Sequence, residues 1–170
     1  MNTTNQVLPE TALLFTTTFL KAWMLQVKRV NEFLDSTSNE DLLKEVAPGR
    51  NTGVYLLGHL TAVNDGILPL LGFCNKLYPQ LEKVFISSPD KSGLSFPSVD
   101  ELREYWNDVN EKLLQHFSTL TPEQWLTKHE AVSAEDFAKE PHRNKLNVVI
   151  VRTTHMSYHL GQFILLTGRE

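Results

Sequence analysis

The chain has 170 residues, of which 41% are apolar and 21% charged, as in an ordinary globular protein, and we expect one domain over residues 1–170. The formal net charge of −4 and the lack of a Lys/Arg stripe argue against nucleic acid as the main partner. No apolar run reaches about 18 residues and the N-terminus lacks the features of a signal peptide, so no membrane partner is expected. The single cysteine, Cys74, excludes an intrachain disulfide, and we expect a cytoplasmic protein.

The first half of the sequence predicts two long helices. Apolar residues recur at helical spacing over residues 10–33, which contain no glycine or proline. Residues 38–41 indicate the start of a short helical turn. A second long helix is expected from Asn51 or Thr52 to about Cys74. Pro69 lies inside it and should kink or end it, because proline has no amide hydrogen.

A long irregular connection separates the second and third predicted helices. Residues 75–97 are rich in proline, glycine and serine, although residues 79–85 could form a short helix. The capping box Ser98–Glu101 then opens a third long helix, which keeps apolar residues on one face as far as Leu120. The connection is long enough to cross the fold, so it could let the second and third helices run parallel.

The last part of the sequence predicts one short and one long helix. Residues 121–124 form a second capping box, with proline at the first helical position, whereas residues 128–143 are polar and indicate a loop. The final long helix is expected from Asn144 to Thr167, with Gly168 as its stop. Since no strand-like alternation occurs, we predict an all-α fold, a four-helix bundle with a long connection between the second and third helices.

Two histidines near the end of the chain are its most informative feature. His155 and His159 are four residues apart in the last predicted helix, which puts both side chains on one face with Cβ atoms roughly 6 Å apart. Two imidazoles on adjacent turns can share one metal ion at about 2.0–2.1 Å per bond. His59, in the second predicted helix, also projects toward the core. Three histidines that face one interior would make an open metal site.

Buried histidines can also be satisfied by neighbouring side chains without a metal. In helical projection, His155 shares its direction with Val148, Val151 and Gln162, which predicts that the histidine pair lies in the buried stripe. A neutral imidazole needs partners for one donor and one acceptor nitrogen, and several unpartnered imidazoles in one core are costly. A divalent cation removes that cost by accepting the lone pairs. The spacing alone leaves the metal site and the satisfied core histidines as equal alternatives.

The segments around these histidines resemble the DinB-like (DinB/YfiT) superfamily of metal-dependent enzymes. The resemblance rests on a Gly-His-Leu segment at residues 58–60 and a His-x-x-x-His-x-Gly-Gln segment at residues 155–162, and it covers most of the chain. It implies a four-helix bundle with one metal ion held by three histidines, which match His59, His155 and His159. Some members are similar to transferases or isomerases that use low-molecular-weight thiols, which implies a small-molecule substrate.

The expected cofactor is one divalent transition metal ion. Three neutral imidazoles leave such an ion positions for water or substrate, and they suit Zn, Ni, Fe or Cu without choosing among them. Bound water could supply hydroxide near neutral pH and a bound thiol would be deprotonated. We therefore expect a metal-dependent transferase, such as a low-molecular-weight-thiol S-transferase, or a hydrolase. The alternatives are a non-catalytic bundle that binds a metal or small ligand, and a purely structural helical protein; a homodimer could form through a helix face.

Three further side chains lie on the same predicted faces. Gln162 could orient a ligand or the bound water, or it could only fill a polar position at a helix interface. Arg152 could meet an anionic substrate, although an ion pair with a carboxylate of another helix is the favoured interpretation. Tyr55 could form a hydrogen bond at the site, but an inward tyrosine is more often a packing residue whose hydroxyl is satisfied elsewhere.

Two other candidates are set aside as metal ligands. Asp65 projects about 120° away from His59 on the second predicted helix, so its carboxylate should point elsewhere. His116 lies on the apolar face of the third predicted helix, close to the C-terminal end of that helix, where a histidinium is favourable. We expect His116 to be structural and not a fourth ligand.

Overall fold

The computed structural model describes residues 4–167, with side chains from Glu10 to Leu166. This part of the chain is helical and has no β-strand, which confirms the predicted all-α class. Its four longest helices are α1 (Thr4–Asp35), α3 (Gly53–Asp65), α6 (Val99–Phe117) and α9 (Lys145–Phe163). Among the described residues, no helix has both the length and the hydropathy needed to cross a membrane.

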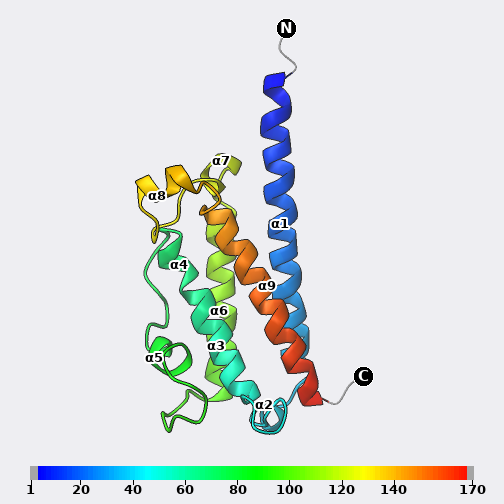
Figure 1. Cartoon of the computed structure of the whole chain (residues 1–170). Coiled ribbons are helices and arrows are strands. Elements are labelled where there is room, and N and C mark those ends of the chain that lie inside the picture. Colours follow the sequence, from blue (N-terminus) through cyan, green and yellow to red (C-terminus); the bar gives the residue numbers. More distant parts are fainter. Residues whose placement is uncertain (1–3, 168–170) are drawn as a thin grey trace.

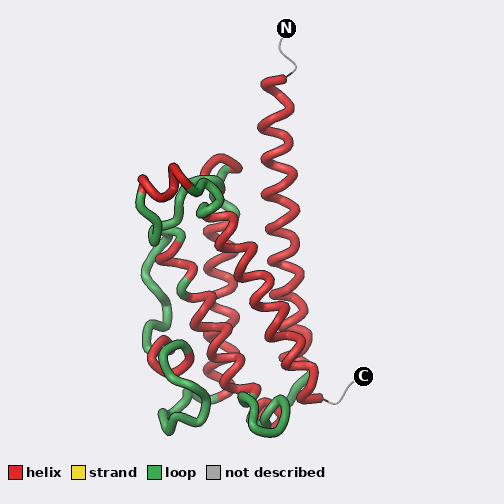
Figure 2. The backbone as a smooth tube through the Cα atoms, in the orientation of Figure 1, coloured by secondary structure: helices red, strands yellow, loops and turns green. Residues whose placement is uncertain are grey.

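The long helices lie side by side, α1 along α9 and α3 along α6 (Figure 1). α3 and α6 run in one direction, and α1 and α9 run in the opposite direction (Figure 1). The chain therefore has to return along the molecule between α3 and α6, and Figure 2 shows this return mainly as loop. The parallel course of the second and third long helices is thus confirmed. α1 also extends past the other long helices at its N-terminal end (Figure 1).

Short helices occupy the connections. They are α2 (Asn39–Leu42), α4 (Ile67–Leu70), α5 (Leu81–Phe85), α7 (Pro122–Trp125) and α8 (Ala134–Lys139), and a 3-10 turn (Ile164–Thr167) follows α9. The helix predicted within residues 79–85 is confirmed as α5, and the capping box at residues 121–124 opens α7. The prediction of a loop throughout residues 128–143 was wrong, because α8 forms there. Ser133 caps α8 by accepting a hydrogen bond from the amide of Asp136 (3.0 Å).

The second long helix ends earlier than predicted. α3 stops at Asp65, and Gly66 leads into the short α4, so the helix does not continue to Cys74. Pro69 explains the position of the break. It has no amide hydrogen for the carbonyl four residues earlier, which belongs to Asp65, and in a continuous helix its ring would clash with that carbonyl. The proline therefore ends the helix one turn before its own position.

Asp65 ties the end of α3 to the connection that follows. Its buried carboxylate accepts hydrogen bonds from the backbone amides of Leu77 (2.8 Å) and Tyr78 (2.9 Å). We predict that Asp65→Ala lowers the free energy of unfolding by about 2–3 kcal/mol, because both amides lose a charged acceptor. Asp65→Asn keeps one acceptor oxygen and should lose less. Urea unfolding measures both differences, and an unchanged midpoint for the alanine variant would contradict this role.

Aromatic side chains pack the long helices together. Trp23 of α1 packs edge-on against Phe117 of α6, with ring centroids 5.7 Å apart, and Phe33 of α1 stacks on Phe163 of α9 at 5.0 Å. α3 is buried on nearly every side between α6, α9 and α5. A side chain carried by α3, such as that of His59, is therefore held on a backbone that packing restrains from several directions.

Candidate metal centre

His59 of α3 and the pair His155 and His159 of α9 meet between these two helices. The Nε2 atom of His155 lies 3.3 Å from Nε2 of His59 and 3.0 Å from Nε2 of His159. The three rings are steeply inclined to one another, with interplanar angles of 64°, 70° and 86°. Three imidazole nitrogens therefore converge on one place from three directions.

Two of these imidazoles have a defined tautomer. Nδ1 of His59 lies 2.8 Å from the carbonyl oxygen of Phe85, and Nδ1 of His159 lies 2.7 Å from Oε1 of Gln162. Since a carbonyl oxygen only accepts hydrogen bonds, both Nδ1 atoms carry the proton and donate it. The other nitrogen of each neutral ring then has a free lone pair. The Nε2 atoms of His59 and His159 thus both present lone pairs to His155.

The third imidazole cannot satisfy both neighbours. A neutral His155 carries at most one proton on Nε2, and its buried Nδ1 has no hydrogen-bond partner among the described residues. Burial, together with the nearby His159, His59 and Arg152, lowers the pKa of His155 to about 4, so this ring is neutral at pH 7. Burial also lowers the pKa of His159. Neutral imidazoles with converging lone pairs are the form in which histidine binds metals.

The spacing of the nitrogens fits a single ion. At bond lengths of about 2.0–2.1 Å, two ligand nitrogens lie about 2.9 Å apart for a right angle at the metal and about 3.4 Å apart for a tetrahedral angle. The separations of 3.0 and 3.3 Å fall within this interval. A divalent cation would accept the lone pairs that no proton can pair, and Zn, Ni, Fe and Cu all suit imidazole. His59, His155 and His159 could hold such an ion.

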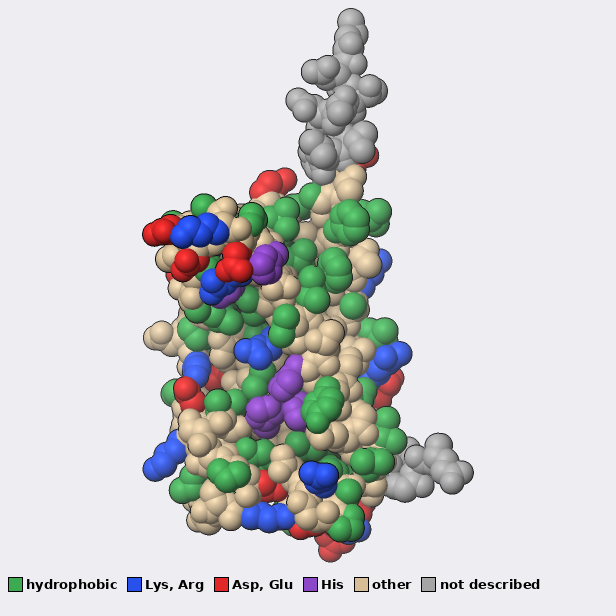
Figure 3. Space-filling view, in the orientation of Figure 1, with side chains coloured by type: hydrophobic (Ala, Val, Ile, Leu, Met, Phe, Trp, Pro, Cys, Tyr) green, Lys and Arg blue, Asp and Glu red, His purple; other side chains and the backbone are tan. Residues whose placement is uncertain are grey.

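His155 lies at the edge of the buried face of α9, not in its middle. That face is centred on Val149, Met156 and Phe163, which are fully buried and project about 100° from His155. On the other side of His155, Val151 is 50% exposed. The prediction that the histidine pair lies in the buried stripe is confirmed for His159, which is 8% exposed, but not for His155, which is only half-buried. Histidine side chains reach the surface between α3 and α9 (Figure 3), so small molecules can approach them from solvent.

The short helix α5 supplies a contact that the sequence did not reveal. Phe85 ends α5, and its carbonyl is one of the last in the helix, which lack partners within it and are free to accept from His59. Tyr55 packs beside the same histidine, with its ring 10° from parallel to that of His59. Its hydroxyl donates to the carbonyl of Ser88 at 2.7 Å, which directs it away from the histidine nitrogens. The sequence predicted a short helix at residues 79–85, but it could not reveal this contact, because every residue has a backbone carbonyl.

Gln162 contacts the histidine cluster directly, and Arg152 borders it. Gln162 accepts the hydrogen bond from His159 and donates from Nε2 to the hydroxyl of Tyr158 (3.4 Å), so it orients the His159 ring. Arg152 is half-buried one turn before His155, close enough to lower the pKa of that residue. The favoured ion pair of Arg152 with a carboxylate is not found, because its guanidinium forms no hydrogen bond or ion pair with any side chain that the structure describes.

The candidates that were set aside lie outside the cluster. Asp65 is occupied by the backbone amides described above. His116 stacks on Phe73, with ring centroids 4.7 Å apart and planes within 3°, and its Nε2 lies 3.9 Å from the sulfur of Cys74. Neither contact involves the three histidines, and His116 is not part of the group of side chains that could hold a metal ion.

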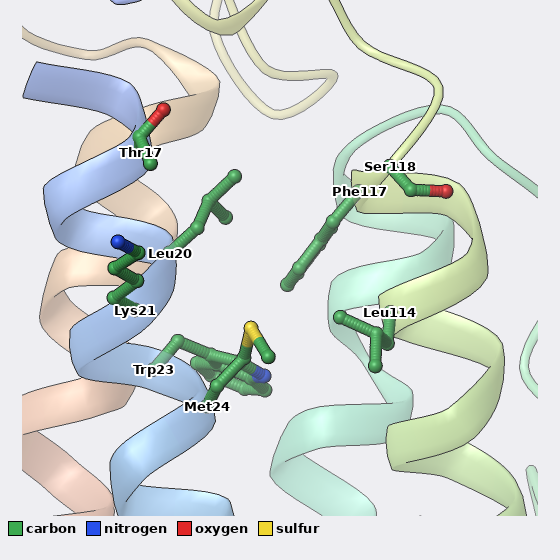
Figure 4. Close-up of a pocket in the computed structure, with 8 residues that line it drawn as sticks. All are labelled: Thr17, Leu20, Lys21, Trp23, Met24, Leu114, Phe117 and Ser118. Carbon is green, nitrogen blue, oxygen red and sulfur yellow. The ribbon is translucent and has the colours of Figure 1, made fainter. Parts of the chain in front are cut away.

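A separate cavity of about 300 Å³ lies between α1 and α6. Leu20, Trp23 and Met24 of α1 face Leu114 and Phe117 of α6 across it (Figure 4). The lining contains none of the three histidines and no carboxylate, so it offers no ligand for a metal ion and no general acid or base. Of these two places, the histidine cluster is therefore the one whose side chains can bind a metal ion or transfer a proton.

Comparison with known families agrees with this geometry. Among curated proteins, no sequence matches the chain. The sequence profile of the DinB superfamily matches residues 22–163, which include all three histidines and both helices that carry them. The match covers well over half of the chain, and metal binding is general in this superfamily. The chain belongs to the DinB superfamily.

Proposed function

We propose that this protein is a metal-dependent transferase that moves the sulfur of a low-molecular-weight thiol onto a small electrophilic substrate. One observation carries the proposal: three imidazoles converge through Nε2, at separations of 3.0 and 3.3 Å, at the surface between α3 and α9. A site with three protein ligands and access to solvent is the catalytic rather than the structural kind. Membership of a generally metal-binding superfamily supports it.

The protein's own side chains have distinct parts in this proposal. His59, His155 and His159 would hold the ion, which when bound supplies a charge that deprotonates a thiol. The Phe85 carbonyl and Gln162 keep the protons of His59 and His159 on Nδ1, so that both Nε2 lone pairs stay directed at the centre. The buried side of α9 excludes water from beneath the cluster, while the surface side admits the substrate.

Thiol transfer fits these residues better than hydrolysis. Metal-dependent hydrolases commonly place a carboxylate beside the metal as general base. α9 contains no aspartate or glutamate, Asp65 is occupied by backbone amides, and no carboxylate contributes to the pKa shifts of His155 and His159. In thiol transfer the thiol loses its proton to solvent, its sulfur forms a bond to an electrophilic carbon, and the leaving group departs with the electrons of the broken bond. No protein carboxylate is needed for these steps.

The test begins with elemental analysis of the protein purified without an affinity tag. The protein is then loaded with the metal found and assayed with 2-mercaptoethanol and 1-chloro-2,4-dinitrobenzene, following the thioether absorbance and the released chloride. We expect a metal-dependent rate above that of the metal-free protein. Failure to take up any metal would overturn the proposal. Full metal uptake with no rate for a range of thiols and electrophiles would favour the alternative, a bundle that binds a metal or small ligand without catalysis.

Gln162 allows a direct test of how the site is oriented. We predict that Gln162→Leu lowers metal affinity about 10–100-fold, because the Nδ1 proton of His159 loses its acceptor. Gln162→Glu keeps an acceptor oxygen and should retain the affinity. Competition with a chromophoric chelator measures both variants. Equal affinity of the leucine variant and the parent would mean that Gln162 only fills a polar position on the helix surface.

Several features of the wider assembly belong to the same proposal. We propose that α1, α3, α6 and α9 act as a four-helix bundle, with the short helices as its connections. A cytoplasmic location and a homodimer remain predictions. The homodimer has a candidate surface on α1, where Leu13, Leu14 and Phe15 are each more than half exposed. Analytical ultracentrifugation of the parent and of Leu14→Lys would test it.

A further inference from the structure

Arg152 is a cation without an internal counterion beside the histidine cluster. Its guanidinium is half-buried on α9, and burial lowers its pKa with no opposing contribution from an acidic neighbour. Its side chain forms no hydrogen bond or ion pair with residues 10–166, the range in which side chains are described. A partly desolvated charge that lacks a partner is costly unless something else pairs with it. Such a residue at the edge of an open site points to a ligand of opposite charge.

The carboxylates of α3 and α5 are engaged elsewhere. α9 has no acidic residue, so Arg152 has no partner on its own helix. Asp65 is the acidic residue of α3, and both its oxygens accept backbone hydrogen bonds. Glu82 is the acidic residue of α5, and it pairs with Lys76. Three neutral imidazoles would not offset the charge of a divalent ion, so the positive charge of the ion would add to that of Arg152.

A basic side chain borders the histidine group on the same face of the molecule (Figure 3). Arg152 precedes His155 by three residues, so their Cβ atoms lie about 5–6 Å apart on the helix surface. A small molecule with a sulfur and an anionic group a few bonds apart could therefore reach both the histidine cluster and the guanidinium. The planar fork of arginine donates two parallel hydrogen bonds to such an oxyanion.

We propose that Arg152 binds an anionic substituent, a carboxylate or another oxyanion, on the thiol substrate and so selects acidic thiols over neutral ones. This inference rests on the proposed function, since it places the sulfur at the histidine cluster. It assigns to Arg152 the role of a substrate-binding residue whose loss affects affinity for acidic thiols and leaves metal binding intact.

The test compares thiol binding to cobalt-loaded protein, followed by the sulfur-to-cobalt charge-transfer band. The probes are 3-mercaptopropionate with a carboxylate, 2-mercaptoethanesulfonate with a tetrahedral oxyanion, and neutral 2-mercaptoethanol. The variants are Arg152→Met and Arg152→Gln, with Lys21→Met as a control that removes the same charge from the exposed surface of α1. The acidity of each thiol is the same whichever protein variant binds it. For each thiol, the dissociation constant of the variant divided by that of the parent therefore isolates the contribution of Arg152.

We expect both Arg152 variants to bind the anionic thiol that the parent prefers about tenfold more weakly, relative to their binding of 2-mercaptoethanol. Lys21→Met should leave this relative affinity unchanged. The anionic thiol whose affinity falls more shows which oxyanion, carboxylate or sulfonate, Arg152 binds better. An unchanged ratio in variants that still bind one cobalt per chain would overturn the inference and leave the proposed function standing. A parent that binds no cobalt and no other transition metal would overturn the proposed function itself. Elemental analysis and circular dichroism of every variant separate these outcomes from loss of fold.

Discussion

Replacing both His155 and His159 by alanine is expected to reduce the bound metal from about one ion per chain to none. One remaining imidazole, His59, cannot hold a divalent ion against competing buffer ligands. The fold should persist, because His155 is half-buried and alanine favours the helix at both positions. Circular dichroism should therefore show the parent helix content, while elemental analysis shows no metal.

The same substitution should remove the stabilisation that metal gives to the folded chain. A ligand present at about 1,000 times its dissociation constant stabilises the native state by about 4 kcal/mol. We therefore expect a strong chelator to lower the melting temperature of the parent and to leave that of the double variant unchanged. His129→Ala with His142→Ala is the control, since it also removes two histidines but leaves the cluster intact. Metal loss in this control, or metal retention in the His155 and His159 variant, would contradict the assignment of the site.

The local part of the site was readable from the sequence, but its orientation toward the core only in part, since His159 is buried and His155 is half-buried. The spacing of His155 and His159 was enough to place both on one helical face. Helical projection then put that face in the core, because Val148 and Val151 flank it, yet Val151 is 50% exposed. The direction in which a helix packs is decided by all its neighbours together, here by Met156 and residues of other helices. A projection of one segment cannot supply that information.

Contacts between distant segments were the other part that sequence could not supply. The side-chain partner of His159 lies three residues further along the same helix, at Gln162, and the orientation of a ligand by Gln162 was one of the two alternatives that the sequence left open. The partner of His59 is a backbone carbonyl 26 residues away, on a helix that was predicted without knowledge of where it packs. The capping signals were also only partly recognised. Those at Ser98 and Thr121 located the starts of helices, whereas the signal at Ser133 was overlooked within a polar stretch.

Gly58 sets how closely α5 approaches α3. A Cβ atom added at Gly58 would lie 2.3 Å from ring carbons of Phe85, far inside any normal contact. The Phe85 ring is fully buried and packs against Tyr55 and Phe96, so it cannot swing away cheaply. We expect Gly58→Ala to push α5 outward and to lower the free energy of unfolding by about 1–3 kcal/mol.

That displacement should also reach the metal site. The carbonyl of Phe85, 2.8 Å from Nδ1 of His59, would move with α5, and loss of such a contact typically lowers metal affinity about 10–100-fold. Gly161→Ala is the matched control, since this glycine is also helical and lies two residues from His159, but a Cβ there would meet no atom within 4 Å. It should stabilise the protein by about 0.5–1 kcal/mol through helix propensity alone. Urea unfolding and chelator competition on both variants decide the matter. Opposite signs in stability, with weaker metal binding only for Gly58→Ala, would show that the packing of α5 on α3 holds His59 in place, whereas equal effects would not.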